Sequence, residues 1–389
     1  KARARFREGE GFMKFNASPR NTLGIEVESG IVDLSTLVLV PRSDDVLTEL
    51  AEPHGDEHPK AKHEFYQSSI EVITGICETV PEAGADLRAT FDEVDEALAK
   101  RGLVLQPGGL HPFSAWHELS VTDKERYRNF AERIQWPARR SMCHGIHYHV
   151  GVQSGDASVA IANSLAVQLP LFIALSASSP FWHGGDTGLD SSRTKVFEAM
   201  PTNDLPPLLS GWGEFEALMQ VLIKGGAIES VRELWWDIRP HPGFGTVELR
   251  MSDSMHTMRE ILALAALAQC LVYDMSRRVE AGETLPSLHH WVLKENKWRA
   301  ARFGLDTQLI ENNEGDNRPI TELIEATVAD LADTAELLGC ADQLADVLRI
   351  VANGNGATRQ RREFARSGDL RTVVEMLIRE WETDSPTGW

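Results

Sequence analysis

The sequence predicts an α+β fold in which antiparallel-looking strands alternate irregularly with helices of varied length. Three short segments place apolar and ionisable residues in alternation, which is the pattern of a strand with one buried face. Longer segments repeat apolar residues at helical spacing. The predicted strands and helices do not follow one another in a regular strand–helix–strand alternation. With 389 residues, 42% of them apolar, the chain can bury a large core.

The first 152 residues predict four strands and two helices. The clearest helix covers residues 81–102, because Pro81 stands at its start, acidic residues follow and Gly102 ends it. Residues 123–140 predict a second, polar helix. The strands are expected at 22–33, 67–76, 103–105 and 144–152.

Residues 157–178 contain no charged side chain and predict a buried helix. The charge-free run continues to Trp182 and is long enough to cross a membrane. It also contains Asn163, Gln168, Pro170 and five serines, so a core helix followed by a loop is the better interpretation.

The next segment, 184–207, is rich in Gly, Ser, Asp, Thr and Pro and is too long for a simple connection. We expect a flexible loop that borders a functional site. Residues 214–224 and 259–281 predict helices, and residues 234–252 predict two strands separated by a break at 240–245. From about residue 288 the chain is expected to be mostly helical and to belong to the same single domain, 1–389.

The formal net charge of −19 argues against a nucleic-acid partner and against binding to anionic membranes. An acidic protein can still bind a nucleotide if arginines and metals line the pocket. The first 15 residues are charged and lack the apolar run of a signal peptide. The four cysteines form no CxxC pair, so we expect free thiols in a reducing cytoplasm.

The three alternating segments share one design. In a strand, residues two apart point to the same face, which pairs Glu26 with Glu28, His147 with His149, and Glu248 with Arg250. If the three strands belong to one sheet, one face is apolar and the other carries carboxylates, imidazoles and a guanidinium. Crowded carboxylates need cations, and this mixture suits hard divalent metals that carry a phosphorylated substrate.

Each pair also has a simpler interpretation. Glu26 and Glu28, about 7 Å apart along a strand, could hold the two ions of a two-metal site or could face solvent on an edge strand. The histidines could be surface or hydrogen-bonded core residues. Arg250 could bind a phosphate or carboxylate, or it could form a structural ion pair with one of the glutamates.

Two further glutamates, Glu64 and Glu71, lie seven residues apart, so a regular strand would place them on opposite faces. Both can point inward only if a bulge intervenes or if Glu64 precedes the strand. The chain has no G-x-x-x-x-G-K-[S/T] loop and no convincing G-x-G-x-x-G after a strand. If ATP binds, metals and arginines must hold its phosphates.

Taken in order, these segments resemble the metal ligands of glutamine synthetase and, more closely, the type 2 glutamate–cysteine ligases, also called carboxylate–amine ligases. The resemblance covers nearly the whole chain. It includes the segments 24–28, 144–150, 175–193, 235–240, 246–250, 296–304 and 354–360. One departure concerns the first strand, which in the family often carries three consecutive glutamates, whereas here Val27 separates Glu26 from Glu28 and Ser29 follows.

The resemblance implies a curved antiparallel sheet of glutamine synthetase type, with helices on its convex face and a helical C-terminal region. Its concave face would hold ATP and two or three Mg²⁺ ions, with Mn²⁺ as a substitute. Glu26, His147 and Glu248 would surround one metal. A second metal would lie among Glu28, Glu64 and Glu71. The ATP phosphates would be approached by His149, and the cations for phosphate and substrate carboxylate would be Arg193, Arg239 and Arg250.

The activity implied is that of an ATP-dependent amide ligase. A small carboxylate, with the γ-carboxylate of glutamate as first choice, would be phosphorylated and then attacked by an amine such as cysteine. The resemblance also suggests a homo-oligomer. The alternatives are a guanidino kinase, a metal-dependent hydrolase that works without ATP, and a non-catalytic relative that binds or regulates.

Overall fold

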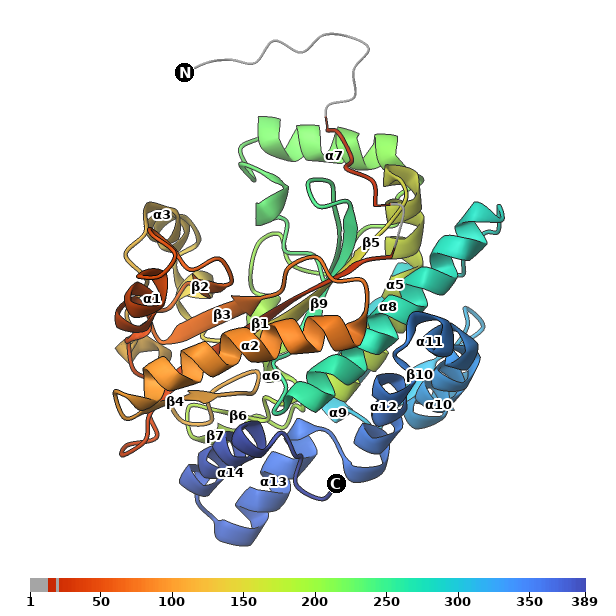
Figure 1. Ribbon diagram of the computed structural model, residues 1–389. Coiled ribbons are helices and arrows are strands. Elements are labelled where there is room, and N and C mark those ends of the chain that lie inside the picture. The colour runs from red at the N-terminus through yellow and green to blue at the C-terminus, as the bar shows by residue number, and fades with distance from the viewer. Residues whose placement is uncertain (1–12, 19–20) are drawn as a thin grey trace.

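A computed structural model describes residues 13–18 and 21–389 of the chain (Figure 1). Most of the charged N-terminal segment, for which no signal peptide is expected, lies outside the described residues. The centre of the molecule is a seven-stranded sheet in which every pair of neighbours is antiparallel. Its strand order is β2-β3-β1-β5-β9-β8, and β4 pairs with β1. The strands are β1 (Leu23–Asp33), β2 (Ala61–His63), β3 (Ser69–Ile73), β4 (Leu103–Gln106), β5 (Gly145–Gly151), β8 (Ile238–His241) and β9 (Thr246–Asp253).

The register of the sheet sets which charged residues become neighbours. Glu26 lies opposite His147, Glu28 lies opposite Glu71, and His149 lies opposite Glu248. Between β5 and β9 the register shifts by one residue, so that two residues of β9 face His147 alone. Such a β-bulge bends the strand and re-aims its side chains.

Three long helices cover the apolar face of the sheet: α2 (Val80–Ala99), α5 (Gly155–Ser176) and α8 (Met258–Glu280). Figure 1 shows α2 and α8 lying across the near side of the strands. Each helix begins at a capping side chain, from Thr79, Ser154 and Thr257 respectively, which accepts a hydrogen bond from a backbone N–H of the first turn. These caps satisfy donors that have no partner within the helix.

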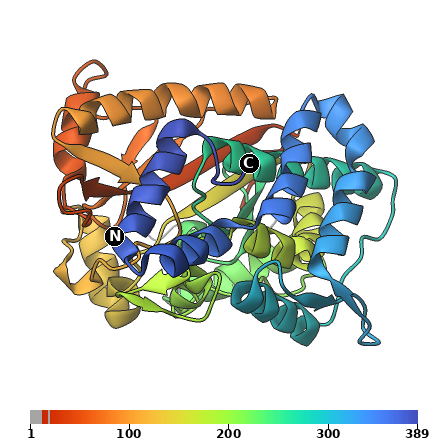
Figure 2. The ribbon, with the colours of Figure 1, turned by 90° about the horizontal axis from the view of Figure 1, so that it is seen from below.

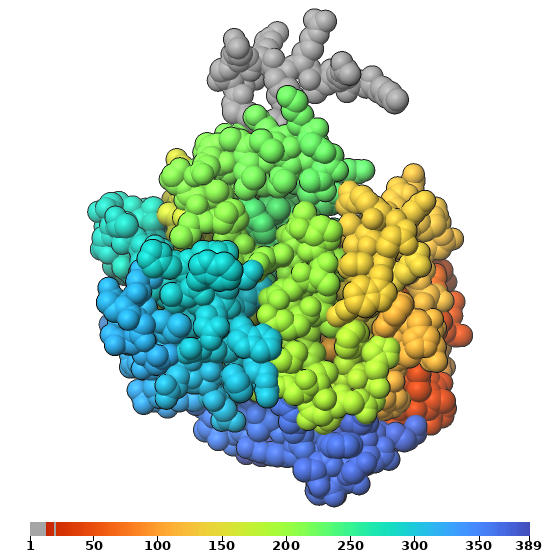
Figure 3. Space-filling view, turned by 180° about the vertical axis from the view of Figure 1, so that it is seen from behind, coloured from red at the N-terminus to blue at the C-terminus, as the bar shows by residue number. Residues whose placement is uncertain are grey.

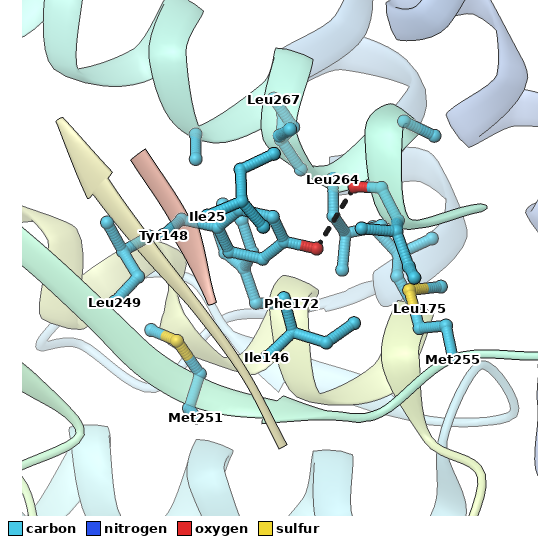
Figure 4. Packing of buried hydrophobic residues seen from close by; sticks show 14 of the residues in the cluster. Ile25, Ile146, Tyr148, Phe172, Leu175, Leu249, Met251, Met255, Leu264 and Leu267 are labelled. Carbon is cyan, nitrogen blue, oxygen red and sulfur yellow. Dashed lines mark hydrogen bonds between the residues drawn. The ribbon is translucent and has the colours of Figure 1, made fainter. Parts of the chain in front are cut away.

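The core between sheet and helices consists of buried apolar side chains. In Figure 4, Ile25, Ile146 and Leu249 of the strands lie against Phe172 of α5 and Leu264 of α8. All five side chains are fully buried. The helix α5 is long and apolar enough to cross a membrane, but 78% of its most apolar window is buried inside the protein. It is therefore the core helix that its polar residues predict.

The remaining elements surround this centre. The C-terminal helices pack across one end of the molecule (Figure 2), where Arg359 of α13 binds Glu260 of α8 at 2.9 Å and Glu380 of α14 at 3.2 Å. These elements are α1 (Ser43–Ala51), α3 (Glu125–Ile134), α4 (Trp136–Arg139), β6 (Phe181–Trp182), β7 (Gly185–Asp186), α6 (Ser192–Phe197), α7 (Trp212–Lys224), α9 (His290–Phe303), β10 (Gln308–Ile310), β11 (Asn317–Pro319), α10 (Ile320–Asp330), α11 (Ala332–Leu338), α12 (Ala341–Asn353), α13 (Gly356–Ser367) and α14 (Leu370–Thr383), with short 3₁₀ turns at Trp116–Glu118 and Val231–Glu233.

Two predictions about secondary structure are wrong in part. The polar helix expected at 123–140 is divided into α3 and α4 at Gln135, whose φ is +60°, because Pro137 cannot continue the helical hydrogen bonds. The segment 184–207 is not one flexible loop, because it contains β7 and α6. The helix α6 begins at Ser191, whose side chain accepts from the N–H of Thr194, and its first residues are buried.

A buried hydrogen bond between Tyr148 of β5 and Ile261 tests how the sheet is joined to α8. The fully buried Tyr148 hydroxyl donates to the carbonyl oxygen of Ile261 at 3.1 Å (Figure 4). We expect Tyr148→Phe to lower the free energy of unfolding by about 1 kcal/mol, measured by urea denaturation. Tyr273→Phe on the same helix is half-buried, has no such bond, and should change it by less than about 0.5 kcal/mol. Equal losses in both variants would contradict this role.

Candidate active site

The polar face of the sheet forms the floor of a cavity of about 610 Å³. Seen from behind, this side of the molecule is hollowed between the yellow region around α3 and the green segments before β8 (Figure 3). All the residues singled out from the sequence line the cavity, although they come from seven separate segments. They are Glu26, Glu28, Glu64, Glu71, His147, His149, Arg193, Arg239, Glu248 and Arg250.

The acidic residues and histidines form three overlapping groups, within each of which the ligand atoms lie no more than 4.8 Å apart. One group matches the predicted second metal site, with Glu28, Glu64 and Glu71. Glu64 follows β2 and Glu71 lies in β3, so Glu64 precedes the strand, as one of the two sequence alternatives requires. Each group has the ligand types that bind Mg²⁺ or Mn²⁺.

The predicted first metal site is regrouped. His149, and not His147, lies with Glu26 and Glu248, whereas His147 lies with Glu26 and Glu71. The reason is the register, which places His149 directly opposite Glu248 and sets His147 opposite the bulge in β9. His147 therefore remains a candidate ligand beside Glu26, but the set Glu26, His147 and Glu248 does not converge as expected.

The carboxyl groups at the Glu28 end have pKa values raised by their surroundings. Burial, together with the charge of Glu64, raises the pKa of Glu28 from 4.5 to about 8. Burial also raises the pKa of Glu64, and burial with the charges of Glu26 and Glu64 raises the pKa of Glu71 well above its usual value. Three carboxylates that share a buried space resist carrying three negative charges unless a cation joins them.

Glu26 is stabilised as an anion by both histidines. Burial alone would raise the pKa of Glu26, but hydrogen bonds and charge from His147 and His149 hold it well below its usual range. The Nδ1 atom of His147 lies 2.9 Å from one oxygen of Glu26, and Nε2 of His149 lies 3.4 Å from the other. Burial lowers the pKa of His147 to about 4, so its imidazole is neutral at pH 7 and available as a metal ligand.

Glu248 is clamped between two arginines, which is the structural ion pair that the sequence left open. Nε and Nη2 of Arg239 lie 2.8 and 2.6 Å from one oxygen of Glu248, and Arg250 pairs with the other oxygen. Burial opposes ionisation of Glu248, but these two guanidinium groups lower its pKa strongly. The carboxylate is therefore charged and fixed in direction.

Arg239 has most of its donors taken by the protein. Besides Glu248, its Nη1 donates to the carbonyl oxygens of Val231, Arg232 and Leu234 at 2.9–3.2 Å. Within the described chain these contacts hold Glu248 against the segment before β8 and use most donors of Arg239, and the expected role of Arg239 as a phosphate cation stays a prediction. Arg250 differs from Arg239 in that its Nε is buried without a hydrogen-bond partner within the described chain.

Arg193 is the other available cation. It lies on α6, and its Nε is likewise buried without a partner among the described residues. The strand β5 begins with Gly145, where an added Cβ would collide with the Arg193 guanidinium, so only glycine leaves the space. The backbone N–H of Gly145 in turn donates to Glu28 at 2.6 Å.

A buried hydroxyl network fixes the start of α6 and hence Arg193. Ser191 and Ser179 donate to the two oxygens of Asp253 at 2.8 and 2.6 Å, and Ser179 accepts from the backbone N–H of Arg193 at 3.0 Å. The segment 184–207 thus borders the cavity as expected, but its central part is anchored and does not have the form of a flexible lid.

The aromatic side chains that line the cavity were not predicted from the sequence. These residues are Phe65, Tyr127, Phe130, Phe197, Trp235 and Phe244, with Arg126, Cys143, Met200, Arg232 and His241 between them. A usable signal was the apolar spacing within 127–134, which marks one face of an otherwise polar helix. Burial raises the pKa of the Cys143 thiol to about 12, so this thiol is a poor nucleophile at neutral pH.

The antiparallel sheet and its carboxylate-lined face are the architecture expected of a ligase that joins a carboxylate to an amine, and the family match supports this class. The model of glutamate–cysteine ligase family 2 matches residues 22–376, and the chain belongs to this family. A Frankia alni protein provisionally named glutamate–cysteine ligase 2-1 is 47% identical over 96% of this chain and 98% of its own length. A Thermobifida fusca protein provisionally named glutamate–cysteine ligase 2 is 44% identical over 96% and 94%.

Solved structures confirm the fold. The glutamate–cysteine ligase of Francisella tularensis in complex with AMP superposes with a TM-score of 0.69 at 13% identity, over 95% of this chain and 89% of that one. A bifunctional glutathione synthetase from Pasteurella multocida gives a TM-score of 0.66 at 13% identity, over 94% of this chain and 52% of that one. The family favours neither the guanidino kinase nor the hydrolase alternative.

The raised pKa of Glu28 predicts a pH-dependent stability difference. The folded protein keeps this proton up to about pH 8 whereas the unfolded chain loses it near 4.5, so the metal-free protein loses stability as pH rises through that window. The Glu28→Gln variant has no ionisable group at this position, so it should not lose this stability as the pH rises. Its melting temperature should exceed that of the wild type by an amount that grows between about pH 5 and about pH 9.

The control for this measurement is Glu229→Gln, an exposed site outside the cavity that should give no pH-dependent difference. A Glu28→Gln variant that melts lower than the wild type at high pH would mean that Glu28 is a structural ion-pair partner.

Proposed function

We propose that this protein is an ATP- and Mg²⁺-dependent carboxylate–amine ligase that forms an amide bond through an acyl phosphate. The observation that carries the proposal is the set of five glutamates gathered on one buried sheet face, Glu26, Glu28, Glu64, Glu71 and Glu248. Two arginines neutralise only Glu248 directly. The remaining negative charge calls for bound cations.

The donor set fits divalent metals. Glu28, Glu64 and Glu71 would hold one ion, and Glu26 with His149 and Glu248, or with His147 and Glu71, would hold another. The raised pKa values at the Glu28 end support this assignment, because Arg193, Arg250 and the Gly145 N–H offset only part of the cost of burying these carboxylates. Bound metals would supply neutralisation of phosphate charge.

ATP is a substrate in this proposal. An oxygen of the substrate carboxylate attacks the γ-phosphorus of ATP, and the bond from that phosphorus to the ADP oxygen breaks. The amine nitrogen then attacks the acyl carbon, loses one proton, and expels inorganic phosphate. Neither step needs a covalent nucleophile from the protein, which agrees with the high pKa of Cys143.

The chain's own residues bind and orient the reactants. Arg193 and Arg250 present guanidinium groups with free Nε–H donors, suited to the oxygens of a transferring phosphoryl group or a substrate carboxylate. Glu248 holds Arg250 through an ion pair and is itself held by Arg239. Holding reactants in line is the main contribution a protein can make to phosphoryl transfer.

Glutamate is our first choice for the carboxylate and cysteine the reference amine, because the relatives carry the name glutamate–cysteine ligase. The test is a screen for ADP release with glutamate, Mg·ATP and a panel of amines. We expect ADP and phosphate to appear together and only when an amine is present. A phosphorylated amine would indicate a guanidino kinase, turnover without ATP a hydrolase, and no turnover a binding protein.

The role of Arg250 can be tested by a substitution that keeps its charge. An ammonium group cannot grip two oxygens as a guanidinium does, so we expect Arg250→Lys to lower kcat/KM roughly a hundredfold, or about 3 kcal/mol. Steady-state kinetics measure this. The control is Arg278→Lys, a half-exposed surface pair with Asp274 and Glu283 that should leave the kinetics unchanged. Wild-type kinetics in Arg250→Lys would leave Arg193 as the phosphate-binding cation.

A further inference from the structure

The two ends of the cavity differ in chemistry. They are separated along β5, from His149 to Gly145, by four residues or about 14 Å. At the His149 end, His241 and Phe244 stack at a centroid distance of 4.2 Å. At the Gly145 end, the Arg193 guanidinium lies 5.6 Å from the Phe197 ring.

The Gly145 end opens onto a row of three aromatic rings. Phe65 follows Glu64 beside β2, Phe130 lies on α3, and Trp235 lies just before β8. The centroids of Phe65 and Phe130 are 5.2 Å apart, as are those of Phe130 and Trp235. The row therefore links segments that adjoin the two edge strands of the sheet, β2 and β8.

An ion pair joins the two segments that carry Phe130 and Trp235. Arg133 of α3 binds Glu233 of the 3₁₀ turn before β8 at 3.0 Å. Met200 and Phe197 complete an apolar compartment beside the aromatic row. Among the described residues, the Glu233 carboxylate beside this compartment is already paired with Arg133, so the compartment differs from the acidic floor and suits an apolar group.

Two arginines stand at the rim of the same compartment. Arg126 and Arg232 are exposed and line the cavity. Within the described chain, neither forms an ion pair with a carboxylate, in contrast to Arg239 and Arg250. Arg232 makes no side-chain hydrogen bond to any described residue, which leaves its guanidinium free for a planar anion such as a carboxylate.

We propose that the acceptor amine is an amino acid whose side chain is apolar and larger than that of cysteine. This inference rests on the proposed ligase function and specifies its second substrate. Phe130 and Trp235 are the specificity-determining residues for the side chain, and Arg232 binds the carboxylate. A purine ring is the competing occupant, but it carries no anion for the rim arginines.

The first test compares acceptors at saturating glutamate and Mg·ATP. The panel is cysteine, alanine, leucine, phenylalanine, and phenethylamine, which is phenylalanine without its carboxylate. An apolar pocket discriminates by about tenfold or more per methylene, so kcat/KM for leucine and phenylalanine should exceed that for alanine and cysteine at least tenfold. Phenethylamine should be about tenfold poorer than phenylalanine, because it leaves Arg232 unpaired.

The second test asks whether the side chain of the acceptor binds in the aromatic compartment. Trp235→Ala and Phe130→Ala should raise the KM for phenylalanine about tenfold and leave the KM for ATP within about twofold. Phe130→Leu keeps an apolar side chain and serves if the alanine variants fold poorly. Trp291→Ala on α9 removes an aromatic ring that is 77% exposed and outside the cavity, so it should change neither constant. Arg232→Gln should make phenylalanine and phenethylamine equivalent.

The outcomes separate this inference from the proposed function. A ligase that prefers cysteine or alanine would overturn the inference and leave the ligase function standing. A rise in the KM for ATP, with the KM for phenylalanine unchanged, would place the nucleotide in the aromatic compartment and would also overturn it. Failure to release ADP with every amine would contradict the ligase function and the inference together.

Discussion

The structure depends on the crowding of carboxylates on one buried sheet face and on the cations that offset it. Glu248 is paired with Arg239 and Arg250, and Glu26 with two histidines. Among the described residues, Glu64 and Glu71 have no such ion pair, and Glu28 reaches only Nε2 of His147, at 4.0 Å. Burial is the main cause that raises the pKa of all three carboxyls. The face is therefore preformed to receive positive charge, and both the fold and the proposed chemistry depend on meeting that need.

The apolar face of the sheet is formed by the alternate side chains of the same strands. Because side chains alternate, each residue that points into the cavity fixes its neighbour in the core, as Val27 lies fully buried between Glu26 and Glu28. A glutamate at position 27, which the family often carries, would here be buried among apolar side chains without a partner. Val27 is thus compatible with an intact site, since the departure falls on the face that packs against the helices.

Segments outside the sheet supply a further cation and the aromatic side chains of the cavity. The anchored α6 brings Arg193 to Gly145, and α3 and the segment before β8 add the aromatic row. The acidic floor supplies the candidate metal ligands, whereas these parts supply a cation and apolar surface beside it. The floor is therefore expected to define the reaction, and the aromatic row to define the acceptor.

The sequence alone determined the strands at 22–33, 144–152 and 234–252, the long helices that cover them, and the residues that share the charged face. Strand and helix periodicity are local properties, so reading them requires no knowledge of distant contacts. Only the tertiary structure decided that His149 and not His147 lies with Glu248, that Arg239 pairs with Glu248, and that α6 interrupts the segment 184–207. Those outcomes follow from strand register, a β-bulge and contacts between residues far apart in the chain, none of which leaves a local pattern in the sequence.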